Sequence, residues 1–140
     1  VLTKGDKMVL TPTYHVFRMY NVHQEAINLP LTCSSKTFTD ANGRECPIVD
    51  ATASRNAEGT INVTLTNTDL ENDAEITVSI ASDGKPSVVG EILTSGNIAD
   101  YNDFDSPDTV QPAEFKGFKV KDGKIIVRMP AKSIVSLCIR

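Results

Sequence analysis

Two histidines near the start of the chain have side chains that could bind a metal ion or transfer a proton. His15 and His23 are eight residues apart, about two turns of an α-helix, so a helix would place them on one side. Glu25 follows two residues after His23 and does not share that face. Because no carboxylate or cysteine stands at a metal-ligand spacing from either, the pattern favours structural histidines over a metal or acid–base site.

An acidic segment at residues 94–114 is the second candidate for chemistry. A calcium loop of the EF-hand type needs a glycine at its sixth position. Counting from Asp103, that position is Asp108, and the fifth is Pro107. The EF-hand is therefore excluded, another kind of calcium site stays open, and a solvated or domain-facing loop is favoured, because loops of this length usually pack against or bind something. The polar residues concerned are Asp100, Asn102, Asp103, Asp105 and Asp108.

The cysteines and aromatic residues limit the remaining kinds of site. Cys33, Cys46 and Cys138 make an odd count, which fits a disulfide framework poorly. Cys33 and Cys46 could still pair across a hairpin in an oxidising compartment, with buried free thiols as the favoured alternative. The chain has no Trp, and Phe115 and Phe118, three residues apart, should face opposite sides of a continuous strand. We therefore expect no flat aromatic platform for sugar binding.

Composition and charge narrow the partners. The chain has 140 residues and a net charge of −4, with its lysines and arginines scattered singly along the sequence. These features suit one globular domain and argue against a nucleic-acid partner. No apolar run is long enough to span a bilayer, and no cofactor motif is present, which leads us to expect neither a membrane partner nor a cofactor.

A helix and a series of short strands must position these residues. Thr11 is a good N-cap and Pro12 suits the first helical position, while Pro30 disfavours helical geometry just before it. The spacing predicts a helix that begins at residue 11, runs through residue 24 and ends near residues 28–30. Its apolar face is formed by Val16, Met19, Tyr20, His23 and Ile27, with Phe17 beside them.

After residue 31 the pattern alternates between apolar and polar residues, as in half-buried antiparallel strands. Strands are predicted at residues 60–67, 75–81, 88–93, 115–120, 124–129 and 133–139, with less regular candidates at 32–39 and 48–54. Turn signals lie at Asn42-Gly43, Glu58-Gly59, Asp83-Gly84 and Asp122-Gly123. The whole predicts a mainly β protein, an antiparallel β-sandwich of jelly-roll-like type preceded by one helix.

Several motifs, in order, resemble one enzyme family. Thr-Pro-Thr-Tyr-His-Val-Phe at residues 11–17, then Met-Tyr and Val-His-Gln, is similar to the end of the catalytic barrel in α-L-arabinofuranosidases of glycoside hydrolase family 51. Gly-Glu-Ile-Leu at 90–93, Asn-Asp-Phe at 102–104 and Pro-Asp-Thr-Val at 107–110 follow in the family's order. So does Pro-Ala-Lys-Ser-Ile-Val at 130–135.

The resemblance implies a divided chain. Residues 1–30 would be the last strand and helix segment of a (β/α)8 catalytic barrel, and residues 31–140 a C-terminal β-sandwich. The helix would then lie against barrel elements upstream, so that its apolar face is exposed, repacked or covered by another copy. In relatives the N-terminal segment of the enzyme also contributes to this sandwich, so one sheet edge would be open here.

The resemblance also implies a function for the parent enzyme. It would remove terminal non-reducing α-L-arabinofuranosyl groups from arabinan or arabinoxylan with retention, using two glutamates about 5 Å apart. Both lie upstream, so no catalytic, substrate-binding or metal residue is assigned here and the chain alone should be inactive. Its partners would be its own barrel, arabinose-containing polysaccharide through the parent, and another copy in a homo-oligomer. Bacterial cytoplasm, periplasm and secretion all stay open. The alternative is an independent carbohydrate-binding module that uses the 94–114 loop and Tyr101.

Overall fold

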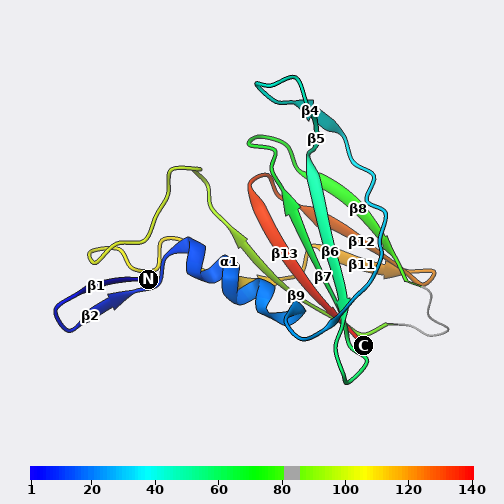
Figure 1. The fold of residues 1–140 in the computed structure, drawn as a ribbon, viewed down its shortest axis with the longest axis horizontal. Coiled ribbons are helices and arrows are strands. Elements are labelled where there is room, and N and C mark those ends of the chain that lie inside the picture. The colour runs from blue at the N-terminus through cyan, green and yellow to red at the C-terminus, as the bar shows by residue number, and fades with distance from the viewer. Residues whose placement is uncertain (81–85) are drawn as a thin grey trace.

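Two antiparallel sheets face each other in the computed structural model, which describes residues 1–80 and 86–140 (Figure 1). The larger sheet has the order β10 (Ala113–Phe115), β9 (Val88–Thr94), β13 (Ser133–Ile139), β7 (Ile61–Asn67), β6 (Val49–Arg55) and β3 (Ile27–Asn28). The smaller has the order β11 (Phe118–Lys121), β12 (Lys124–Met129) and β8 (Ala74–Ser79). The prediction of a mainly β, antiparallel sandwich is confirmed.

One helix and two small hairpins complete the chain. Helix α1 (Pro12–Tyr20) continues into the 3-10 turn η1 (Asn21–His23). Hairpin β1 (Leu2–Lys4)–β2 (Lys7–Val9) precedes the helix, and hairpin β4 (Thr37–Thr39)–β5 (Glu45–Pro47) projects beyond the edge of the sandwich (Figure 1). Among the described residues, no helix is long and apolar enough to cross a membrane.

The core lies between the two sheets because alternate residues of each strand point to the same side. From the larger sheet, Leu65, Val135 and Leu137 are buried there, and from the smaller sheet Ile125 and Val127 face them. Each such aliphatic side chain stabilises the fold by about 1.5–3 kcal/mol relative to an exposed one. Strand β13 anchors the arrangement, since it pairs with β7 on one side and β9 on the other along its whole length.

The predicted strand at residues 115–120 is instead two strands, and this corrects one inference. Phe115 ends β10 in the larger sheet, and Phe118 begins β11 in the smaller sheet. The chain crosses between the sheets at Gly117, where an added Cβ would lie 2.7 Å from the Phe115 ring. The two rings therefore meet, with centroids 6.2 Å apart. The expectation that they face opposite sides was wrong because it assumed an unbroken strand.

The helix begins as predicted and ends earlier. The Thr11 hydroxyl accepts a hydrogen bond from the Tyr14 N–H, and Pro12 occupies the first turn. The predicted end near residues 28–30 was wrong: α1 stops at Tyr20, and Glu25, at φ 56°, turns the chain out of the helical direction. Residues 27 and 28 then pair with β6 as an edge strand. The segment before Pro30 is therefore part of the sheet, and Pro30 does not end the helix.

The other strand predictions are confirmed with small shifts, except at residues 32–39, where only the last three form a strand. The Asp122-Gly123 hairpin is confirmed, with both residues at positive φ, 50° and 73°, the geometry that a tight two-residue β turn requires. The Asp83-Gly84 turn and the end of the predicted strand at residue 81 lie outside the described residues.

Candidate functional site: the helix and the sheet edge

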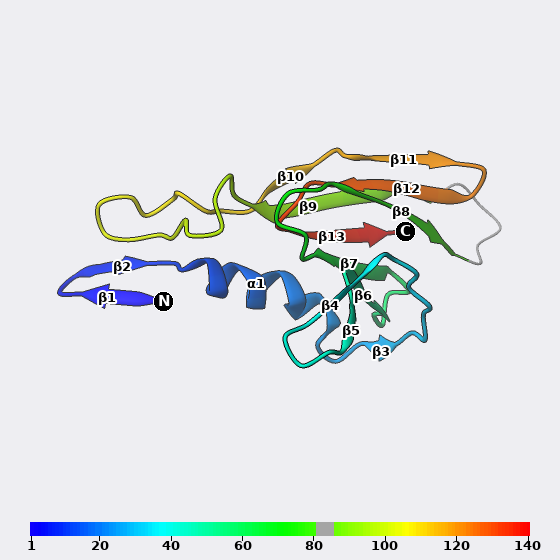
Figure 2. The same cartoon turned by 90° about the horizontal axis from the view of Figure 1, so that it is seen from above.

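The inner face of α1 packs on the outer face of the larger sheet, on the side away from the smaller sheet (Figure 2). Met19, with 2% of its surface exposed, forms a small cluster with Leu93 and Val110, and Val16 and Ile134 pack against it. The expectation that this face is exposed, repacked or covered by another copy was therefore wrong for the Val16–Met19 side of the helix, which packs on the chain's own sheet and loop. Leu93 and Ile134 of the sheet cover this side of the helix, although they lie 70 or more residues away from it in the sequence.

A row of hydroxyl groups completes this junction. The Tyr20 hydroxyl lies 3.1 Å from Thr66 Oγ1. The two ring nitrogens of His23, Nδ1 and Nε2, lie 2.7 Å from Ser54 Oγ and 2.8 Å from Thr64 Oγ1. In the neutral ring one nitrogen donates and the other accepts, and burial lowers the pKa of His23. Both nitrogens are thus occupied in holding η1 on β6 and β7.

His15 lies further along the same face, in different surroundings. It is 9% exposed, and its ring meets Tyr14 edge-on at 5.5 Å between centroids. Burial and then the Arg18 charge lower its pKa, against the opposing effect of Glu91 and Asp108. Its Nδ1 has no hydrogen-bond partner in the described part of the chain. The two histidines share a helix face as predicted but meet separate neighbours.

The 94–114 segment packs against the start of the helix through Asn102. This side chain is 2% exposed; its Nδ2 donates to the carbonyls of Leu10 and Val110, both at 2.8 Å, and its Oδ1 accepts from Val110 N at 2.7 Å. The predicted long loop occupies residues 95–112, between β9 and β10. It is a domain-facing loop at Asn102, and Tyr101 beside it is 66% exposed.

The acidic side chains of this loop bond to the loop itself. One carboxylate oxygen of Asp103 accepts hydrogen bonds from the backbone N–H groups of Asp105 and Ser106. Asp100 accepts from the Ser95 hydroxyl and the Asn97 N–H. Within residues 1–80 and 86–140, no three His, Cys, Asp or Glu side chains gather closely enough to hold a metal ion.

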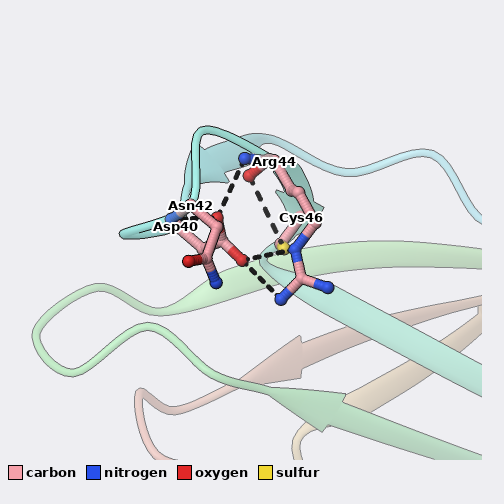
Figure 3. A network of polar contacts seen from close by, with 4 residues as sticks. All are labelled: Asp40, Asn42, Arg44 and Cys46. Atoms are coloured by element: carbon pink, nitrogen blue, oxygen red, sulfur yellow. Dashed lines mark hydrogen bonds and ion pairs between the residues drawn. The ribbon is translucent and has the colours of Figure 1, made fainter.

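The β4–β5 hairpin is similarly self-contained (Figure 3). Asp40 accepts hydrogen bonds from the backbone N–H groups of Asn42 and Arg44 and an ion pair from the Arg44 guanidinium at 2.7 Å, and these contacts lower the pKa of Asp40. Cys46 Sγ lies 3.7 Å from the Arg44 carbonyl. Cys33, whose pKa is raised by burial, bonds to a different carbonyl. Both thiols are free, so the pairing left open by the sequence is not formed.

The outer face of α1 is aromatic and exposed. Phe17 has 74% of its surface accessible, and Tyr14, one helical turn before it, has 38%. In the same part of the molecule, Leu2 and Met8 of the β1–β2 hairpin are also exposed. Among the residues predicted for the apolar side of the helix, Phe17 and Ile27 are exposed. Phe17 lies on the outer face of α1, and Ile27 lies beyond the helix on the edge strand β3.

A groove of about 620 Å³ runs along the open side of the sandwich. Strand β8 ends the smaller sheet, and on its far edge no strand of the described chain pairs with it. The groove is lined by β8, by the β6–β7 part of the larger sheet and by the segment at residues 29–34. Ile76 and Val78 of β8 line it, half-buried. The sequence predicted an open sheet edge but not its position. The signal that could have located it is the apolar alternation in β8, a strand that has a neighbour on one side only.

Comparison with known proteins places this fold. The sequence matches, over residues 1–133, the family model described as the α-L-arabinofuranosidase C-terminal domain. It is 44% identical over 137 residues to an intracellular exo-α-L-arabinofuranosidase of Bacteroides ovatus, covering 98% of this chain and 27% of that protein. This chain thus spans about a quarter of that relative's length.

Solved structures agree. The family 51 arabinofuranosidase of Xanthomonas axonopodis pv. citri superposes with a TM-score of 0.91 and 39% identity, covering 99% of this chain and 28% of that one. A family 51 α-L-arabinofuranosidase of Bifidobacterium longum has the same fold at a TM-score of 0.83 and 18% identity, covering 94% and 26%. An independent carbohydrate-binding module finds no support in these relatives. The chain belongs to the family of C-terminal domains of glycoside hydrolase family 51 α-L-arabinofuranosidases.

Proposed function

We propose that this chain is the non-catalytic end of an enzyme that removes terminal non-reducing α-L-arabinofuranosyl groups from arabinan or arabinoxylan, with retention of configuration. The observation that carries the proposal is the 44% identity, over 98% of the chain, to an exo-α-L-arabinofuranosidase. A retaining enzyme needs two carboxylates about 5 Å apart, one as nucleophile and one as acid/base. We place both in the part of the parent that precedes this chain, and assign no catalytic residue here.

The role of this chain would be to join the sandwich to the catalytic barrel. In this proposal residues 1–30 are the last segment of the barrel and residues 31–140 are the sandwich. The inner face of α1 already holds the sandwich through Met19 and His23. The outer face, with Phe17 and Tyr14 exposed, is then the surface that the barrel covers. Burying a phenylalanine of this kind contributes roughly 1.5–3 kcal/mol.

The groove beside β8 would receive an extended segment from the beginning of the parent chain. A strand added there would pair with the open edge of β8 through main-chain hydrogen bonds. Ile76 and Val78 offer it a half-buried apolar floor. This would extend the smaller sheet and remove an exposed edge, which otherwise invites pairing between molecules.

Release of 4-nitrophenol from 4-nitrophenyl α-L-arabinofuranoside tests the catalytic part of the proposal. The parent enzyme should turn this substrate over, and the 140-residue chain alone should not. Turnover by the chain at a rate comparable to the parent would contradict the assignment of catalysis upstream, and an inactive parent would contradict the activity.

A single substitution tests the joining role. Phe17→Asp should leave the melting temperature of the isolated chain nearly unchanged, because the side chain is 74% exposed there. In the parent it should lower the melting temperature by several degrees, because the same side chain would be buried against the barrel. Equal effects in the two proteins would refute the placement of the barrel on this face.

A further inference from the structure

The outer face of the smaller sheet gathers positive charge that the sequence disperses. In β12, Ile125, Val127 and Met129 are buried, so the residues between them point outward. Partners directly opposite in adjacent strands point to the same side. The strand registers therefore bring Lys119, Lys121, Lys124 and Arg128 to one face, with Ile126, Thr77, Ser79 and Glu75. Four cations and one carboxylate share this face in a chain of net charge −4. The sequence argument that the basic residues are scattered singly does not hold for this surface.

Three of these cations have no ion-pair partner in the part of the chain that the structure describes. Arg128 pairs with Glu75 at 3.1 Å. Within residues 1–80 and 86–140, no carboxylate lies within ion-pair distance of Lys119, Lys121 or Lys124. Lys121 and Lys124 stand directly opposite each other across the hairpin, and like charges in that position destabilise a sheet. Pairing within the sheet therefore gives no reason to place these two lysines opposite each other.

Protection of a sheet edge explains only part of the pattern. Lysines on an edge strand discourage pairing with other molecules, and this accounts for Lys119 and Lys121 on β11. It does not account for Lys124, which stands on β12, the central strand of the smaller sheet, whereas Arg128 on the same strand is paired with Glu75. The face has the properties of a binding surface for anions.

We propose that this face binds an acidic polysaccharide, a polyuronate chain with one carboxylate on each sugar. Lys119 and Lys121 stand about 7 Å apart along β11, Lys124 and Arg128 about 13 Å apart along β12, and Lys121 and Lys124 about 5 Å apart across the two strands. One extended chain can therefore meet several of them. Thr77 and Ser79, both exposed on β8, offer hydroxyls to the sugars. The face holds no aromatic residue, so neutral arabinan has no stacking surface here. This class of ligand rests on the proposed function, in which the parent acts on polysaccharides.

The other anionic partners fit less well. Nucleic-acid binding draws its affinity from many Lys and Arg contacts to phosphates, and this face offers four cations, one of them paired with Glu75. A membrane-associated face needs large apolar side chains among its lysines, and here only Ile126 is apolar and it is half-buried. The face also stays accessible in the parent as proposed, because it lies on the opposite side of the larger sheet from α1 (Figure 2).

Binding to de-esterified polygalacturonate, measured by affinity electrophoresis and by anisotropy of a labelled oligogalacturonide, tests the inference. The chain should bind at low ionic strength and lose binding at 1 M salt, where the screening length is about 3 Å. Lys119→Thr, Lys121→Thr and Lys124→Thr together should weaken binding roughly tenfold, the combined effect of three exposed ion pairs. The matched control replaces Lys4, Lys7 and Lys36 by threonine, which gives the same net charge and should change binding less than about twofold.

The inference would be overturned if the chain did not bind polygalacturonate at low ionic strength, or if the two triple variants lost binding affinity equally. It would also be overturned if fully methyl-esterified polygalacturonate, which has the same sugars without the charge, bound equally well. Tighter binding of poly-L-glutamate than of polygalacturonate would replace the glycan by an acidic protein partner. Because the assay reads binding and not arabinose release, an inactive parent would refute the proposed function and leave this result standing.

Discussion

Replacing Asn102 by alanine should detach the long loop from the helix and destabilise the chain. Asn102 is 2% exposed, and its amide joins three backbone groups in two distant parts of the sequence: the carbonyl of Leu10, and the carbonyl and N–H of Val110. Each hydrogen bond contributes about 1 kcal/mol net, and a buried N–H left without a partner costs about 1–3 kcal/mol. We expect a loss of about 3 kcal/mol in the free energy of unfolding.

Urea unfolding followed by circular dichroism measures this loss, and the melting temperature should fall by about 10 °C. Asn97→Ala is the matched control, because Asn97 is an exposed residue of the same loop whose side chain accepts one hydrogen bond, from the Ala99 N–H. It should lose less than about 1 kcal/mol. If Asn102→Ala stays within about 1 kcal/mol of the unsubstituted chain, the amide does not hold the loop on the helix and the reasoning fails.

Three further outcomes can be checked on the same chain. Met19→Ala should lower the free energy of unfolding by roughly 2–5 kcal/mol and Phe17→Ala by less than about 0.5 kcal/mol, since Met19 is buried and Phe17 is exposed; similar losses in urea melts would contradict the assigned helix faces. His15 and His23 have lowered pKa values in the fold, so their stabilisation should be complete above the unfolded value of about 6.5 and decline as pH falls below it. Urea melts between about pH 7.5 and 5.5 should show the decline, and His23→Gln should reduce it; stability that rises on acidification would refute the assignment. Added calcium should leave the melting temperature unchanged, because the loop carboxylates bond to their own backbone; a rise that chelation reverses would reveal a calcium site.

Local chemistry was enough to predict the elements themselves. Thr11 and Pro12 specify where the helix begins, since a cap and a first-turn proline act within four residues. The alternation in β7 and β8 predicts both strands and the side of each that carries the apolar residues, because a period of two is fixed by strand geometry. Asp122-Gly123 specifies its turn, because both positions need positive φ.

Contacts between distant segments could not be predicted in this way. Which face of the helix is covered depends on Ser54 and Thr64, which lie 31 and 41 residues from His23. In the sequence these hydroxyls are simply the polar residues that alternate with apolar ones along a strand. No neighbouring residue indicates whether the polar side of the strand faces solvent or is covered by a helix. The basic face has the same origin, because it exists only in the register of three strands.

The helix consequently belongs to two layers at once. Its inner face contributes Met19 to a cluster with Leu93 and Val110, and removing the helix would expose those side chains of the sheet and loop. Its outer face presents Phe17 at 74% exposure, more than a helix that only closes a sandwich would need. A helix that is apolar on both sides is normally buried between two partners. The sandwich supplies the first, and the second is the surface against which we place the barrel, so that the helix transmits the position of one unit directly to the other.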